Sequence, residues 1–130
     1  MITLKEFQGK EESSVSTLFA KLFESRNFAH YVHLRTKSYA QHKALNSFYE
    51  DIVELSDSLY ETYAGKYGQI RFDAGASVKE EDPIKYFENM GDMLSDAQDF
   101  FNEKDTHLIN ILDEIKALIY RTLYKLKFLK

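Results

Sequence analysis

The sequence has no cysteine, no tryptophan and a single proline, and it has only five glycines. Without cysteine the chain can form no disulfide, thiolate metal site or iron–sulfur cluster, and it has no cysteine nucleophile. One proline and five glycines are too few for an all-β fold, which needs many tight turns. No apolar run approaches the roughly 18–20 residues that a membrane-spanning helix needs. These absences favour a helical domain without cysteine chemistry.

The length and composition are those of one folded domain. The 130 residues are 44% hydrophobic and 15% aromatic, which is enough to build a core. The formal net charge is −4, so bulk charge gives no support to nucleic-acid binding. The first residues lack the apolar core of a signal peptide. We therefore expect a cytoplasmic protein with no membrane partner.

Apolar residues recur at helical spacing along almost the whole chain. The pattern predicts an all-α fold and one domain spanning 1–130, with four helices at about 12–35, 38–64, 83–103 and 105–128. The predicted ends rest on local signals: a capping box at Ser38 and Gln41, a stop at Gly65, Asp82 before a proline, and a possible cap at Asp105.

The predicted connections between the helices are short, long and short. A short connection makes neighbouring helices antiparallel, whereas residues 65–82 are long enough to return along a bundle of roughly 35 Å. A four-helix bundle with one long crossover, here between the second and third helices, is the ferritin-like arrangement. An up-and-down bundle with a loose loop is the alternative.

Metal-ligating side chains gather on the first two predicted helices. His30, His33 and His42 fall within 13 residues, and Asp57 and Glu61 follow, spaced by four residues on one face of a helix. Such a polar stripe is often only a solvated helix face. Histidine is uncommon, however, and histidine with carboxylate is a ligand set that suits iron, zinc or manganese.

The spacing requires two copies of the chain to form such a site. His42 and Asp57 point to roughly the same side of the second helix but lie about 22 Å apart along it. They can share an ion only if a two-fold axis sets two of these helices side by side and antiparallel. His42 of one copy then lies beside Asp57 and Glu61 of the other, and His30 or His33 completes the histidine pair.

This spacing, His30–(12)–His42–(15)–Asp57–(4)–Glu61, resembles that of the Dps-type miniferritins, the DNA-binding proteins from starved cells. The stretch 33–49 is also similar to small ferritin-like proteins encoded by tailed phages. The resemblance covers about residues 15–65.

The resemblance implies a homo-oligomeric shell, typically a dodecamer, with ferroxidase sites shared between two-fold-related subunits. Such a shell oxidises Fe(II), by family analogy with peroxide, stores ferric iron and protects against oxidative damage. On this basis His33, His42, Asp57 and Glu61 would be the catalytic residues, with iron as the metal. Either His33 or His30 could hold the first ligand position.

Two departures from the family leave a second function open. The family commonly has tryptophan after its first histidine, where this chain has Tyr31, and an acidic residue one turn after the second, where it has Asn46. Asn46 would be a weaker metal ligand. A non-enzymatic shell or dimer, binding a partner or DNA, is therefore the alternative.

No acidic residue stands three positions before any histidine, so the Glu-x-x-His of an intra-bundle di-iron site is missing. His107 is accordingly expected on the surface. In the third helix five acidic residues form one face that is either solvated or attracts cations: Glu88, Asp92, Asp96, Asp99 and Glu103.

Residues 116–130 carry basic side chains and no acidic ones: Lys116, Arg121, Lys125, Lys127 and Lys130. Basic residues near a helix C-terminus are favoured by the helix dipole, and a contact with DNA or a partner is the alternative. Tyr120, Tyr124 and Phe128 recur every four residues among them, which predicts a packing stripe.

Overall fold

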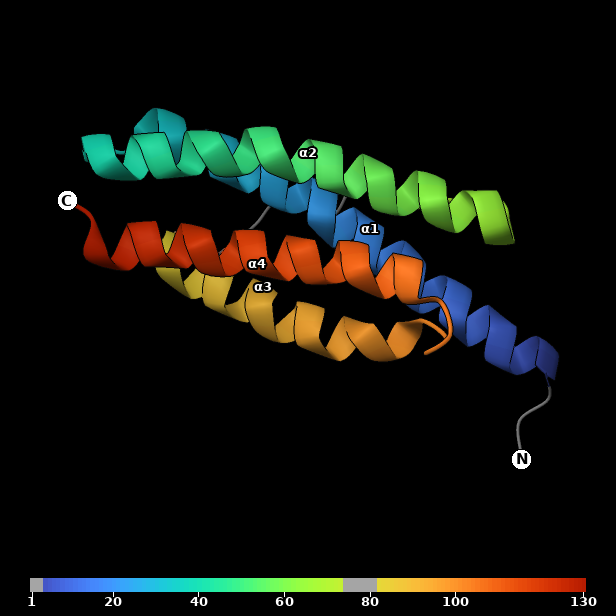
Figure 1. The fold of residues 1–130 in the computed structure, drawn as a ribbon. Helices are drawn as coiled ribbons and strands as arrows, with labels where there is room; N and C mark the ends of the chain where they lie inside the picture. The colour runs from blue at the N-terminus through green and yellow to red at the C-terminus, as the bar shows by residue number, and fades with distance from the viewer. Residues whose placement is uncertain (1–3, 74–81) are drawn as a thin grey trace.

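The computed structural model describes residues 4–73 and 82–130, with side chains from residue 13 onward. Every regular element in these residues is helical (Figure 1). The elements are α1 (Leu4–Arg35), α2 (Tyr39–Tyr67), α3 (Pro83–Ala97), the short 3-10 helix η1 (Gln98–Phe100) and α4 (Thr106–Phe128). The predicted all-α four-helix bundle is confirmed.

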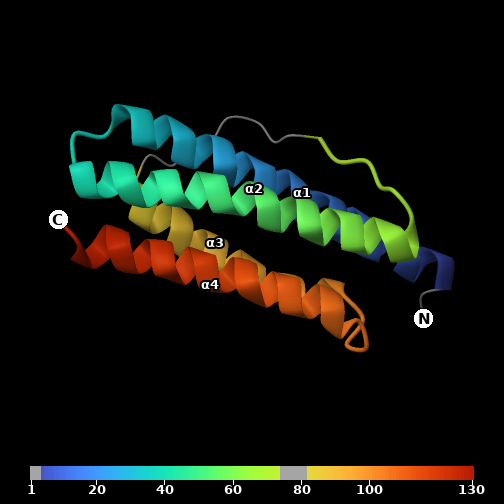
Figure 2. The same cartoon turned by 45° about the horizontal axis from the view of Figure 1, so that its top comes forward.

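The helices form two antiparallel pairs. α1 and α2 are joined by a short turn at one end of the bundle, and α3 and α4 are joined at the other end (Figures 1 and 2). α2 packs against both α1 and α4, and α3 packs mainly against α4. Because α2 and α3 run in the same direction, the chain returns along the bundle between them, and residues 68–73 start this return beside α1 (Figure 2).

Two predicted helix starts are confirmed by their caps. The Ser38 hydroxyl accepts a hydrogen bond from the Gln41 backbone N–H at 3.2 Å, where α2 begins. Asp82 caps α3 by accepting from the Ile84 N–H at 3.0 Å, and Pro83 occupies the first helical position.

Two predicted helix ends are wrong. α2 continues through Gly65 and ends at Tyr67, and the stop is Gly68, whose φ of 93° strongly favours glycine. α3 ends at Ala97, not near 103, because the tighter η1 turn and the extended Phe101 that follows it bring the Phe101 ring back into the core. Glu103 therefore lies in the turn before α4.

The other boundaries differ less. α1 begins at Leu4, not near residue 12. Residues 4–12 include lysine, glutamate and glutamine, which favour helix without needing burial. The predicted connection 65–82 shortens to 68–82, of which 74–81 lie outside the described residues.

The core follows the predicted stripes. Phe19 of α1, Phe48 of α2 and Phe87 of α3 are fully buried, as are Leu108, Leu112 and Ile115 of α4. Burying one such side chain stabilises the fold by roughly 1.5–3 kcal/mol. The four buried stripes together therefore make the main favourable contribution to the free energy of folding.

The predicted packing stripe on α4 is wrong. Tyr120, Tyr124 and Phe128 are 51%, 57% and 69% exposed. Tyr124 and Phe128 point away from the buried leucines and isoleucines of α4, and the Tyr120 ring lies beside Gly91 of α3 at the edge of the bundle. Helical spacing alone therefore did not predict that these rings are exposed.

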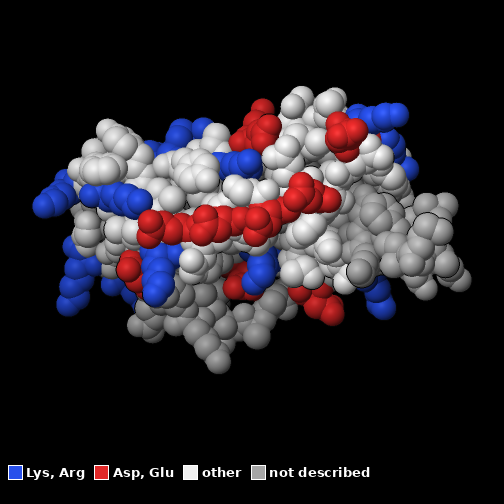
Figure 3. Space-filling view, turned by 90° about the horizontal axis from the view of Figure 1, so that it is seen from below, with Lys and Arg blue, Asp and Glu red and all other residues white. Residues whose placement is uncertain are grey.

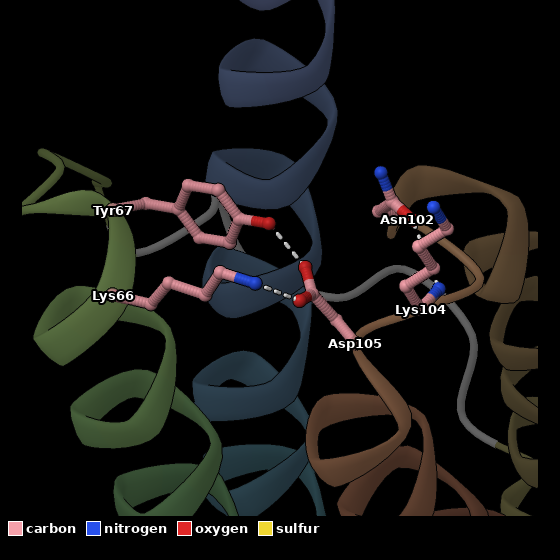
Figure 4. A network of polar contacts seen from close by, with 5 residues as sticks. All are labelled: Lys66, Tyr67, Asn102, Lys104 and Asp105. Carbon is pink, nitrogen blue, oxygen red and sulfur yellow. Dashed lines mark hydrogen bonds and ion pairs between the residues drawn. The ribbon is translucent and has the colours of Figure 1, made fainter.

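A buried carboxylate joins the end of α2 to the start of α4. Asp105 is 1% exposed, and its two carboxylate oxygens accept hydrogen bonds from the Lys66 ammonium and the Tyr67 hydroxyl (Figure 4). Asp105 is the N-cap residue of α4, but its side chain makes no capping hydrogen bond, contrary to the predicted role. We call Lys66, Tyr67 and Asp105 the Asp105 network.

The Asp105 network changes the pKa values of its members. Burial alone would raise the Asp105 pKa, but the hydrogen bonds and charge from Lys66 and the hydrogen bond from Tyr67 outweigh it and lower that pKa below its usual 3.8. The hydrogen bond to Asp105 in turn raises the pKa values of Lys66 and Tyr67.

Replacing Asp105→Asn should lower the free energy of unfolding by about 1–3 kcal/mol at pH 7, because two hydrogen bonds to a charged acceptor are lost. The folded pKa of Asp105 is lower than the unfolded one, so its stabilisation is present above the unfolded pKa and is lost as the pH falls through the folded pKa. Urea unfolding between pH 7 and pH 3 should therefore show a smaller acid-induced loss in Asp105→Asn than in the wild type. The exposed Asp99→Asn is the control and should lose as much stability on acidification as the wild type. If Asp105→Asn also loses as much as the wild type, this assignment is wrong.

Candidate functional site

Three histidines meet where α1 passes into α2. His30 and His33 lie in the last turns of α1, and His42 lies in the first turn of α2, across a turn of three residues. The His33 and His42 rings are stacked with centroids 3.7 Å apart and planes 20° apart. The His30 and His33 ring centroids are 6.1 Å apart. The predicted gathering of these histidines therefore occurs within one chain.

His33 and His42 are hydrogen-bonded to each other in a reciprocal way. The His33 Nδ1 lies 2.8 Å from the His42 carbonyl oxygen, and the His42 Nδ1 lies 2.8 Å from the His33 carbonyl oxygen. A carbonyl oxygen can only accept, so each Nδ1 must carry the proton. In the neutral rings the lone pair is then on Nε2, which is the arrangement that prepares histidine for a metal. We call these two residues the histidine pair.

A tyrosine and an asparagine border the histidine pair. The Tyr49 ring stacks on His30 with a centroid distance of 4.6 Å and meets His33 edge-on at 5.3 Å. The Tyr49 hydroxyl donates to the Asn46 side-chain oxygen at 2.7 Å. Asn46, a predicted metal ligand, therefore already accepts one hydrogen bond inside the chain. Sequence spacing gave no signal for this contact.

The predicted carboxylates lie farther along α2. Asp57 and Glu61 are exposed and border a pocket of about 340 Å³ whose other walls are Phe23, Tyr60 and Phe72. Phe72, from the returning connection, stacks on Phe23 with ring planes 9° apart and centroids 5.5 Å apart. The connection thus gives the carboxylate pair an aromatic wall.

The described residues of one chain do not assemble a metal site. Among the side chains of residues 13–73 and 82–130, no group of three or more histidines, aspartates or glutamates could hold an ion. The histidines and the carboxylates stand apart along α2, as the spacing predicts. Any site that combines them needs a second copy.

The charged surfaces match the predicted pattern in part. Seen from below, acidic side chains form a row along the bundle (Figure 3), and α3 and η1 supply exposed Glu88, Asp92, Asp96 and Asp99. Lys127 of α4 pairs with Glu88 at 3.3 Å, so part of the basic segment is already neutralised. His107 is exposed at the start of α4, as expected.

A sequence profile of the family of unknown function DUF5856 matches residues 33–126, which is most of the chain. The chain belongs to this family. The part matched by the DUF5856 profile begins at His33 and includes His42, Asp57 and Glu61, whereas His30 lies just before it. The match assigns no activity.

The chain is also similar to a protein of Enterobacteria phage T4, the uncharacterized 14.6 kDa protein in the mobD–ri intergenic region. The two are 26% identical over 121 residues, which is 92% of each chain. This similarity agrees with the expected relation to phage-encoded proteins. No solved structure matches the chain. In the part of the chain that the structure describes, none of the helices is long and apolar enough to span a membrane.

The histidine pair should be energetically coupled. Replacing His33→Ala or His42→Ala removes the hydrogen bond that the lost ring donates and the stacking that the two rings share, so each variant should be less stable by about 1–2 kcal/mol. The double variant should lose clearly less than the sum of the two single losses, as urea unfolding can measure. Additive losses would show that the two side chains act independently.

Proposed function

We propose that this DUF5856 protein is a ferritin-like iron protein of the Dps type, whose metal site is shared by two copies related by a two-fold axis. His42, with His33 or His30, binds Fe(II) from one side. Asp57 and Glu61 of the other copy bind it from the facing side, and Asn46 is an accessory ligand. Zinc and manganese are metals that the same ligand set would also suit.

The observation that carries the proposal is the reciprocal hydrogen bonding of the histidine pair. Both Nδ1 atoms are occupied by backbone carbonyls, which leaves Nε2 as the ligating atom of each neutral ring. The two stacked rings supply at most two Nε2 ligands, which is fewer than an iron ion takes. Ligands from outside the pair must therefore complete the coordination.

The exposed carboxylates supply such ligands. Asp57 and Glu61 share a helix face, and no hydrogen bond or ion pair to another described residue occupies either side chain. In an antiparallel pair of α2 helices, residues near 42 of one copy lie opposite residues near 57–61 of the other. The half-buried Tyr49 and Val53 lie between these ends and would form the apolar centre of the contact.

The direction of the helices supports the ferritin-like part of the proposal. α2 and α3 run the same way, and the long connection returns along the bundle, which is the arrangement of bundles with one crossover. A dodecameric shell of such bundles would enclose a cavity for iron storage.

The proposed reaction is the oxidation of iron by peroxide. Two Fe(II) ions each give one electron to one hydrogen peroxide, which takes up two protons and leaves as two waters. The carboxylates balance the charge of the Fe(III) products, and the imidazoles fix the positions of the ions. The acidic row of α3 would draw cations toward the shell. Consuming Fe(II) and peroxide together protects against oxidative damage.

A hybrid of two inactive variants tests the shared site. His42→Ala should abolish tight Fe(II) binding and peroxide-dependent oxidation, and so should Asp57→Asn with Glu61→Gln, whereas the exposed His107→Ala should behave as the wild type. In an equal mixture refolded together, about half of the dimers are hybrids and each hybrid regains one of its two sites, so binding should return to about a quarter of the wild-type stoichiometry. Calorimetry measures Fe(II) binding, and the absorbance of Fe(III) measures oxidation. If the mixture stays inactive, or if isolated monomers bind iron, the shared site is excluded.

One observation favours a second, non-enzymatic function. The Asn46 oxygen accepts from Tyr49, so the position where the family has an acidic ligand is engaged in internal packing. The bundle would then be a binding protein that uses residues 116–130. DNA is the less favoured partner for this segment, because the acidic row of α3 flanks it and Lys127 is paired with Glu88.

A further inference from the structure

The outer face of α4 combines exposed aromatic rings with charges of both signs. Tyr120, Tyr124 and Phe128 are more than half exposed on its C-terminal half. Its N-terminal half carries the exposed acids Asp113 and Glu114. We call the exposed residues around Ala117 the α4 face: Asn110, Asp113, Glu114, Ala117, Tyr120, Arg121, Tyr124 and Phe128. Three large exposed rings in one row are unusual on a surface that contacts only water.

We propose that the α4 face binds the α4 face of a second copy, with the two helices antiparallel and crossing at Ala117. This contact is separate from the proposed α1–α2 interface and does not depend on metal binding. The two contacts together would link copies into assemblies larger than a dimer.

The position of Ala117 suits such a crossing. At 100° per residue, Asn110, Tyr124 and Phe128 lie within about 20° of the direction of Ala117, so they form the centre line of the face. Ala117 is exposed and has the smallest side chain on that line, which lets two helix backbones approach closely.

The charges of the α4 face are complementary to themselves. A two-fold axis at Ala117 places a residue one turn before it on one copy opposite the residue one turn after it, on the same flank of the face, on the other. At 100° per residue, Glu114 and Arg121 lie on one flank of the centre line, and Asp113 and Tyr120 lie on the other. Glu114 then faces Arg121, and Asp113 faces the hydroxyl-bearing Tyr120. Each of these contacts occurs twice, because the interface is isologous.

This self-complementarity favours a second copy over a nucleic acid. A nucleic acid needs a surface of one positive sign. The α4 face instead changes from acidic to basic along its length, and the groove beside it is lined by Glu88 and Asp92 of α3. The aromatic row of each copy would lie over the N-terminal half of the other helix, with Tyr124 opposite Asn110, and so would be removed from water.

A single introduced cysteine tests the crossing, because the chain has none of its own. Two helices that cross at a small residue bring their Cα atoms to roughly 4–6 Å, which a disulfide can bridge. The full-length Ala117→Cys variant should therefore form a disulfide-linked dimer on mild oxidation at micromolar concentration. Ser95→Cys, exposed on α3, is the matched control and should stay monomeric on a non-reducing gel.

Charge reversal in the Ala117→Cys background then tests the pairing. Glu114→Arg or Arg121→Glu alone should slow cross-linking by about tenfold, because like charges then face each other. The two reversals together should restore it, whereas Lys85→Glu should change nothing.

The proposal is overturned if Ala117→Cys cross-links no faster than Ser95→Cys, or if the double reversal fails to restore the rate. It is also overturned if the α4 face instead binds labelled duplex DNA and Arg121→Glu abolishes that binding. His42→Ala should leave the cross-linking unchanged, so failure of the proposed metal site and failure of the α4 contact are separate results.

Discussion

The geometry of the α1–α2 turn depends on the histidine pair. The last carbonyls of a helix lack partners within the helix, and the His42 ring supplies one by donating to the His33 carbonyl. The His33 ring makes the corresponding bond to the His42 carbonyl, so two helix ends are joined by two side chains. The same bonds that close the turn also determine which ring nitrogen remains available for chemistry. Structure and proposed function thus rest on one pair of hydrogen bonds.

Much of the fold could be predicted because burial follows helical spacing. The stripes that include Phe19, Phe48 and Phe87 are buried, and the caps at Ser38 and Asp82 lie where their sequence signals place them. For the candidate site, the sequence correctly indicated that the histidines gather and that the carboxylates stand apart from them. These features depend on local spacing, which a sequence shows directly.

The features that could not be predicted depend on contacts between distant residues. α2 continues beyond Gly65 because Lys66 and Tyr67 form hydrogen bonds with the buried Asp105 carboxylate. Asp105 in turn does not cap α4, because both of its carboxylate oxygens accept these hydrogen bonds. Spacing likewise shows that Tyr120 and its neighbours share a face of α4, but it does not show that this face lies away from the core. The reciprocal bonds of the histidine pair have no sequence signal of their own.

α2 is fastened at both of its ends, by the histidine pair at its start and by the Asp105 network at its end. A helix held in this way can neither slide along its axis nor turn about it without breaking one set of bonds. Deleting one residue from its middle would rotate Asp57 by about 100° relative to His42, and neither fastening could absorb that rotation. The number of residues in α2 is therefore constrained more tightly than their identity along its solvent-facing side.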